Sequence, residues 1–213
     1  MSQPANKDRK KPRTASKEQR KIQLIKATIR SIAKHGLSVT TMSTVAKEAG
    51  LSQGIINLHF QSKDRLLEET LRYVVDEYRS AWFVALENSG DSAVEKLTAV
   101  IAMEFEKRIC QRNKLAVWFA FWGESRSRPT YRQICAERDL EYREVLRGLC
   151  EEIINDGGYT CRADFVAYGL SAMTEGLWLD LLLQSADMTP EQAIEICIAY
   201  LQSVFPQHFG DDK

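Results

Sequence analysis

Several features are missing from this sequence of 213 residues, and each absence excludes a class of protein. No uninterrupted apolar run approaches the roughly 20 residues that a membrane-spanning helix needs, and no apolar segment of the signal-peptide type follows the basic N-terminus. We therefore expect a cytoplasmic protein with no membrane partner. Neither an alternating apolar pattern typical of strands nor an internal repeat occurs, which favours an all-α fold.

Residues that commonly bind metals or carry out catalysis are also few. The three histidines, His35, His59 and His208, show no ligand spacing with one another or with cysteine, and no phosphate loop or nucleophile elbow occurs. The sequence thus predicts no catalytic residue, no metal site and no cofactor, which argues against an enzyme. The five cysteines are odd in number and widely spaced, without a Cys-x-x-Cys pair: Cys110, Cys135, Cys150, Cys161 and Cys197.

Two interpretations of the cysteines remain open. They are either buried or idle thiols, or Cys110 or Cys161 is a redox sensor, because each has an arginine close in sequence that favours a thiolate.

Charge is divided unequally along the chain. Residues 1–72 contain 15 Lys and Arg against 6 Asp and Glu, while the remaining 141 residues contain 14 against 23. The basic part is expected to face a polyanion, and the acidic part something else. Residues 1–15 have two prolines, five basic residues and no apolar periodicity, which predicts a disordered basic arm. Such an arm either tracks DNA phosphates or merely aids solubility.

Apolar residues at helical spacing predict about nine helices. Ser16 with Gln19 resembles a capping box for the first, and Ser62 is expected to cap a long fourth helix that bridges two domains. An apolar stripe that includes Ile134 and Leu140 runs along the seventh. The predicted ranges are approximately 16–36, 41–50, 52–58, 63–88, 94–105, 115–123, 129–157, 163–184 and 189–204.

The stretch from Thr41 to Leu67 predicts a helix-turn-helix. Thr41 is expected to cap the first of its helices, and Gly50 to end it in a conformation with positive φ. The hydroxyl of Ser52 is expected to cap the next helix, whose Gly54 allows DNA to approach the backbone closely. Phe60 is expected to pack between the helices.

This stretch resembles the DNA-binding motif of TetR-family repressors. The matching pattern is T-x-x-x-V-A-x-x-A-G-L-S-x-G-x-x-x-x-H-F-x-S-K-x-x-L, from Thr41 to Leu66. The resemblance implies a homodimer formed through helices eight and nine, an operator read in two successive major grooves, and release when an effector enters the C-terminal domain. We expect an arm at 1–15, a DNA-binding domain at 16–62 and a ligand-binding and dimerisation domain at 63–213.

The same resemblance assigns DNA contacts to individual residues. Lys63, at the start of helix four, is expected to bind a phosphate, with plain solvation as the alternative. Many family members have Tyr where this chain has Asn57, so Asn57 either pairs with an adenine or only binds water. Thr41 and Ser52 are primarily caps that could also bind phosphate. The expected DNA-facing residues are Thr41, Ser52, Gln53, Gly54, Ile55, Asn57, His59 and Lys63.

Aromatic residues gather in the acidic C-terminal part. Trp118, Phe121 and Trp122 share one helical face, and carboxylates such as Glu175 lie near apolar runs. Aromatic rings together with carboxylates suit an organic cation held on the ring faces. The alternative interpretation is ordinary core packing. The segments AVWFAFWGES and GLSAMTEGLWLDLLL are similar to the C-terminal domain of BetI-type repressors, whose effector is choline. The predicted ligand-binding residues are Tyr78, Trp82, Trp118, Phe121, Trp122, Glu175 and Trp178.

Three functions follow from these observations. The first is a repressor released from a palindromic operator by choline or another organic cation. The second is a TetR-type regulator of efflux or fatty-acid genes that senses a lipophilic or acyl ligand. The third is a helical adaptor without regulatory DNA binding, against which the basic charge of residues 1–72 argues.

Overall fold

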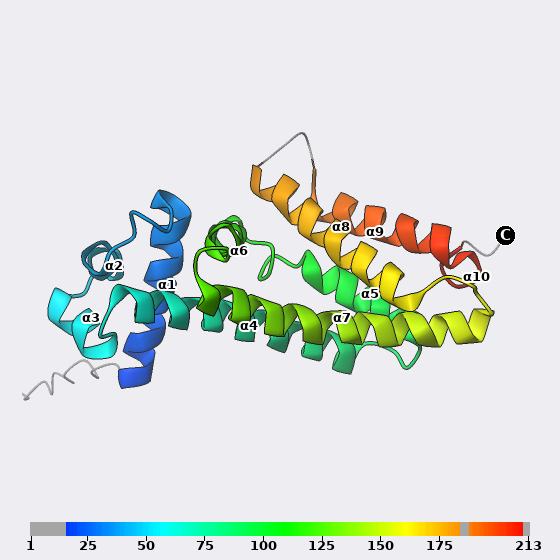
Figure 1. Ribbon diagram of the computed structural model, residues 1–213, viewed down its shortest axis with the longest axis horizontal. Coiled ribbons are helices and arrows are strands. Elements are labelled where there is room, and N and C mark those ends of the chain that lie inside the picture. The colour runs from blue at the N-terminus through cyan, green and yellow to red at the C-terminus, as the bar shows by residue number, and fades with distance from the viewer. Residues whose placement is uncertain (1–15, 184–187, 211–213) are drawn as a thin grey trace, which may run out of the picture.

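A computed structural model of the protein describes residues 16–183 and 188–210, and these are helical apart from short connections. The predicted basic arm at 1–15 lies outside the described residues. Figure 1 shows an elongated molecule with α1 to α3 at one end and α10 at the other. The helices are α1 Lys17–His35, α2 Met42–Ala49, α3 Gln53–His59, α4 Lys63–Asn88, α5 Ala93–Glu104, α6 Arg112–Glu124, α7 Pro129–Gly157, α8 Ala163–Leu183, α9 Pro190–Val204 and α10 Pro206–Phe209.

Local sequence signals set most of the helix ends. The capping box of Ser16 and Gln19 is present, with the Gln19 amide donating to the Ser16 hydroxyl at 3.2 Å. Thr41 caps α2 as predicted and forms a second box with Thr44. Gly50 then ends α2 with φ 65°, in the left-handed region that glycine adopts without a steric penalty. Ser62 caps α4, also as predicted, and Thr189 caps α9.

Two sequence expectations about the helices were wrong. Ser52 precedes α3, but its hydroxyl makes no capping hydrogen bond; the helix starts with its backbone carbonyl accepting from the amide of Ile55 at 3.1 Å. Leu140 is 62% exposed rather than part of a buried stripe, because Arg138 and Tyr142 occupy the inward side of α7 at that level. The short α10 adds a tenth helix to the nine predicted.

The first three helices contribute to the hydrophobic core, which continues into the other helices. Phe60 is buried, as predicted, together with Val45 and Ile56. The side-chain amide of Gln23 on α1 donates to the carbonyl of Ala49 at the end of α2 with a distance of 2.9 Å. This bond satisfies a carbonyl that has no partner within its own helix, and it fixes α2 on α1.

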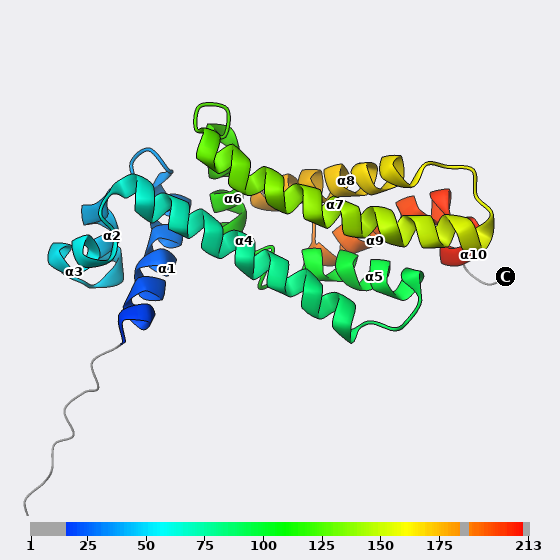
Figure 2. The same ribbon diagram turned by 60° about the horizontal axis from the view of Figure 1, so that its bottom comes forward.

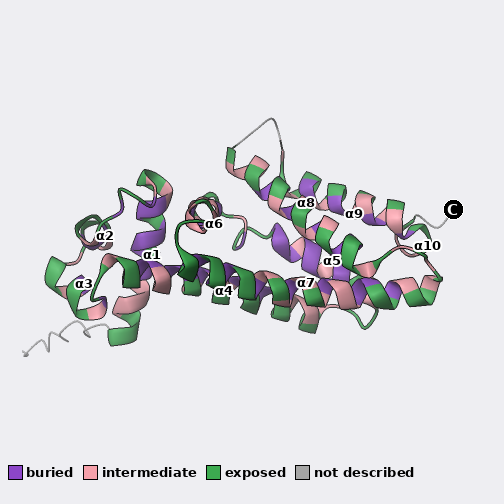
Figure 3. Ribbon diagram, in the orientation of Figure 1, coloured by how far each residue is buried: buried purple, intermediate pink, exposed green. Residues whose placement is uncertain are grey.

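The long helix α4 connects this end of the molecule to the rest. Near its start Leu67 is buried beside the first three helices, and further along Tyr78 and Trp82 are buried among α5 and α7. The turned view in Figure 2 shows that α4 leaves the group formed by α1, α2 and α3 and extends into the other helices. There it lies beside α5 and α7. The buried residues form an inward stripe along α4 (Figure 3). Both ends of the molecule therefore share one rigid element.

None of the described helices is long and apolar enough to cross a lipid bilayer. Within residues 16–183 and 188–210, no group of three or more His, Cys, Asp or Glu residues is arranged so that it could hold a metal ion.

The two caps predict a difference in stability. We expect Thr41→Ala to lower the free energy of unfolding by about 1 kcal/mol, because it removes a side-chain cap. Ser52→Ala should change it by a few tenths of a kcal/mol at most, since no cap bond is lost. Urea unfolding followed by circular dichroism measures both. Equal losses in the two variants would contradict the structural difference between the caps.

Candidate functional sites

The second helix of the motif, α3, presents most of its side chains to solvent. Ile56 is its only buried residue and holds the helix on the core, while Gln53 and Asn57 are exposed on successive turns. Their side chains are joined, with the Gln53 Nε2 donating to the Asn57 Oδ1 at 3.3 Å. Figure 3 shows the outer side of α3 as exposed. The helix therefore carries a paired amide surface that can face a DNA groove.

Gly54 lies on this surface, and the fold does not require a glycine at this position. A Cβ built there would meet only the Ser52 hydroxyl, at 3.8 Å, and the residue has no positive φ. The packing of the protein itself would thus accept alanine. Gly54 is the second residue of α3, and close approach by an external partner is a physical reason for a glycine there.

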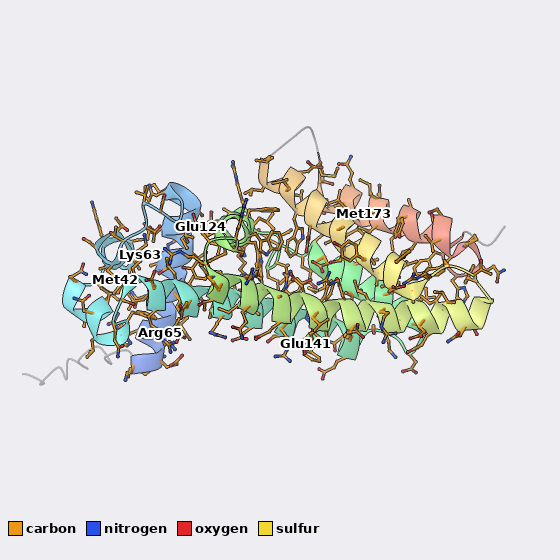
Figure 4. The ribbon with its side chains drawn as sticks, in the orientation of Figure 1. Met42, Lys63, Arg65, Glu124, Glu141 and Met173 are labelled. Carbon is orange, nitrogen blue, oxygen red and sulfur yellow. The ribbon has the colours of Figure 1, made fainter. Side chains whose placement is uncertain are left out.

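The other predicted DNA contacts differ in exposure. Thr41 and Ser52 are exposed, whereas Ile55 and His59 are half-buried. The Lys63 ammonium group donates to the backbone carbonyl of Ser38 at 2.9 Å, so in the free protein it ties the start of α4 to the turn before α2. Figure 4 shows Lys63 at this junction, on the same end of the molecule as Met42.

Sequence reasoning missed Leu58, which is 73% exposed on α3. A large exposed apolar side chain between two polar ones suits contact with a thymine methyl group. The signal was available, because Leu58 does not fall on the stripe defined by Ile56 and Phe60.

At the other end of the molecule, aromatic rings from four helices meet around Tyr78. The ring centroid of Tyr78 lies 6.1 Å from Trp118, 5.6 Å from Tyr142 and 5.8 Å from Trp178, each in an edge-to-face arrangement. Trp122 extends this set through Trp118, at 5.8 Å. We call these five residues the ring cluster. Four of them were predicted as ligand-binding residues, and Tyr142 was missed.

Two other predicted residues lie at the edge of this arrangement or outside it. Trp82 is stacked on Phe83 at 4.0 Å and reaches the ring cluster only through Tyr142, at 6.4 Å. Phe121 forms an edge-to-face pair with Tyr131, at 4.9 Å. The helical face expected to carry Trp118, Phe121 and Trp122 together is therefore divided between two aromatic pairs.

A cation of the protein itself occupies the ring cluster. Arg138 on α7 is 6% exposed, and its guanidinium carbon lies 5.0 Å from the ring centroid of Tyr78, 4.7 Å from Trp118 and 5.7 Å from Trp122. Its Nε donates to Asp139 at 2.6 Å, and its Nη2 lies 3.8 Å from Glu175. The third nitrogen, Nη1, has no hydrogen-bond partner among the described residues.

A buried carboxylate lies below the rings. The hydroxyl of Tyr78 donates to the Oε1 of Glu104, and the Trp178 indole donates to the backbone carbonyl of Glu104 at 3.1 Å. The second oxygen, Oε2, has no partner in the described part of the chain. Burial raises the pKa of Glu104 to about 7, although the hydroxyls of Tyr142 and Tyr78 and the charge of Arg138 act in the opposite direction.

Glu104 thus takes the position that the sequence assigned to Glu175. Glu175 lies at the edge, with its side chain 43% exposed, and burial raises its pKa. Glu104 and Arg138 were both missed. Each lies at helical spacing within an apolar stripe, three residues after Ile101 and four after Ile134, and a charged residue in such a stripe is a signal of a buried polar site.

Among the cysteines, Cys110 does not lie in surroundings that activate its thiol. Its Sγ donates to the carbonyl of Phe105 at 3.0 Å, and burial raises its pKa. A raised pKa disfavours the reactive thiolate, which argues against the redox interpretation for this residue. Burial also raises the pKa of Cys135 and Cys197 to about 11.

Comparisons with known proteins match both ends of the chain. Residues 24–70 match the family of bacterial regulatory proteins described as tetR. Residues 93–206 match the C-terminal domain described as a BetI-type transcriptional repressor.

Individual proteins agree with these matches. A BetI HTH-type transcriptional regulator from Burkholderia thailandensis is 33% identical, over 89% of this chain and 95% of the relative. The crystal structure of a protein described as a transcriptional regulator, from Pseudomonas aeruginosa PAO1, has a TM-score of 0.80 at 30% identity and covers 92% of this chain and 95% of that one. A regulator from Saccharomonospora viridis, solved in complex with choline, has a TM-score of 0.77 at 22% identity, over 85% of this chain and 95% of that one.

The buried carboxylate predicts a dependence of stability on pH. The native state holds the Glu104 proton up to about pH 7, whereas an unfolded glutamate loses it near its ordinary pKa of 4.5. This contribution to stability is therefore present at low pH and is lost as the pH rises through 7, by an amount on the order of 3 kcal/mol.

We expect Glu104→Gln to remove that dependence. From about pH 5 to pH 8 the free energy of unfolding of the wild type should fall relative to that of the variant. Urea unfolding at several pH values measures the difference. A constant difference over this range would mean that Glu104 is already ionised at pH 5.

Proposed function

The chain belongs to the TetR family of transcriptional regulators and has a C-terminal domain of the BetI type, and on that basis we propose that it is a dimeric repressor released from its operator by an organic cation. Its relatives are regulators rather than enzymes, in agreement with the sequence prediction. The observation that carries the proposal is the exposed α3 with its amide pair and its unconstrained Gly54.

We place the operator contacts on α3 and the two caps beside it. Gln53 and Asn57 read base edges in the major groove, and Gly54 lets the backbone approach the DNA. Thr41 and Ser52 bind phosphates through their hydroxyls and the adjacent amides, and Lys63 exchanges its bond to Ser38 for a phosphate. The half-buried Ile55 and His59 support this surface from its edge. The domain boundary falls between residues 62 and 63, where α4 begins.

Dimerisation through α8 and α9 is supported by apolar side chains on their outer sides. Phe165 and Tyr168 are exposed on the first turns of α8, and Ile196 is exposed on α9. Large exposed apolar residues on two packed helices are typical of an interface between subunits. Two copies joined in this way present two α3 helices to half-sites about 34–36 Å apart.

The effector site is the ring cluster with Glu104 beneath it. Ring faces attract a methylated ammonium group, which has no hydrogen to donate, and a buried carboxylate supplies the counter-charge. The carboxylate is already held by Tyr78 and oriented between α4 and α8. A cation bound there contacts α4 directly, and a shift of α4 changes the separation of the two α3 helices.

The DNA contacts predict a separation of stability from function. Gly54→Ala should fold at least as stably as the wild type, because alanine favours a helix by up to about 1 kcal/mol and has room here. Its operator affinity should nevertheless fall by about tenfold or more, since the added methyl group meets the DNA.

Gly148→Ala on α7 is the matched control, because a Cβ there meets nothing within 4 Å and the residue is likewise helical. The operator is first selected from random duplexes, and affinities are then measured by fluorescence anisotropy. Failure to enrich a palindrome would refute the repressor function. Equal affinity of Gly54→Ala and Gly148→Ala would remove α3 from the DNA interface.

The effector site predicts selective stabilisation by a quaternary ammonium ion. Choline at about 100 times its dissociation constant should stabilise the protein by ~2.7 kcal/mol and release it from the operator. The neutral carbon analogue, in which a tert-butyl group replaces trimethylammonium, should have little effect. Glu104→Gln should weaken choline binding. Thermal shift assays measure the effect of choline, of its neutral analogue and of Glu104→Gln. If only fatty acyl compounds stabilise the protein, the effector is an acyl compound and not a cation.

A further inference from the structure

Arg138 is a charged side chain in a position where the proposed effector would sit. Its guanidinium lies within 5.7 Å of three ring centroids of the ring cluster, on faces that attract any cation. Two cations cannot share these faces, because like charges at this distance in a buried site repel strongly. An effector must therefore either be excluded or replace the guanidinium.

The hydrogen bonds of Arg138 allow its guanidinium to move away from the rings. Two of its nitrogens are held by the neighbouring Asp139, whose side chain is partly exposed, but Nη1 has no partner among the described residues although it is buried. An unpaired buried donor is costly, so the present position of the guanidinium is not a fully satisfied one. The rings, in contrast, are fixed by their mutual packing.

A second position for the guanidinium lies next to the first. Arg138 also lines a groove of about 330 Å³ on the surface between α4 and α7. Three acidic residues border this groove, with Asp76 and Glu137 exposed and Glu141 paired with Arg79 at 2.5 Å, and Arg72 lines it as well. Glu141, labelled in Figure 4, lies along the edge of the α4 and α7 pair. An arginine that leaves the rings by rotation of its side chain meets carboxylates there, in water.

We propose that Arg138 is a tethered competitor for the effector site: an organic cation takes its place on the rings, and the guanidinium moves into the groove between α4 and α7. The proposal rests on the cation-responsive function above and adds its regulation. The exchange leaves the number of cations on the rings constant, so Glu104 keeps a counter-charge throughout. It also sets the sensitivity of the response, because only the fraction of molecules with Arg138 withdrawn can bind the effector. Since Asp76 lies on α4, the arriving guanidinium acts on the helix that leads to the DNA-binding end.

The test measures choline binding to the full chain by isothermal titration calorimetry. Arg138→Met removes the competing charge but keeps a long flexible side chain, and should bind choline about tenfold more tightly. Arg138→Lys keeps a competing cation and should stay within about threefold of the wild type. Arg132→Met is the matched control, because Arg132 is an exposed arginine on the same helix.

Variants of the groove provide an independent test with exposed residues. Asp76→Asn combined with Glu137→Gln should weaken choline binding several-fold, because the displaced guanidinium loses its acceptors. The same pair introduced into Arg138→Met should have no effect, whereas a general loss of negative charge would weaken binding in both backgrounds. If Arg138→Met is unstable, the groove variant in the wild-type background still tests the proposal, because it changes only exposed residues.

The outcomes separate the two proposals. Wild-type binding of choline with equal or weaker binding by Arg138→Met overturns the competitor role and leaves the cation-responsive function intact. Absence of choline binding in every variant, while operator binding persists, overturns both the competitor role and the cation effector. The exchange is supported if Arg138→Met binds choline more tightly and the groove substitutions weaken binding in the wild type but not in Arg138→Met.

Discussion

The continuity of α4 is the constraint on which the two ends of the molecule depend. Its 26 residues correspond to about 39 Å of helix, and no glycine or proline interrupts them. Lys63 at its first turn touches the turn before α2, while Tyr78 four turns later is the ring around which the cluster forms. Because a helix is stiff along its axis, a displacement at Tyr78 is transmitted to Lys63 rather than absorbed between them.

The ring cluster balances opposite charges in a site that excludes water. Arg138 and Glu104 are both buried, and each keeps one polar atom without a protein partner in the described part of the chain. Such a pair is a weak contributor to stability, since desolvation offsets much of the attraction.

The helices could be predicted from the sequence, whereas the chemistry of the ring cluster could not. Ser16, Thr41, Gly50 and Pro129 act on residues within one or two turns, so their effects on helix ends are local and predictable. The identity of the buried carboxylate depends instead on how α5 crosses α4 and α8, which pattern alone does not specify. Glu175 was therefore selected for its proximity to apolar residues in sequence, while Glu104, 74 residues before the Trp178 that bonds to it, was not.

The placement of the tryptophans has an optical consequence. All four lie after residue 81, and three of them, Trp118, Trp122 and Trp178, belong to the ring cluster. Indole emission is sensitive to the electric field of a nearby cation, and the guanidinium lies over two of these indoles. The C-terminal part of the protein therefore carries an intrinsic fluorophore, while helices α1 to α3 contribute no indole signal of their own.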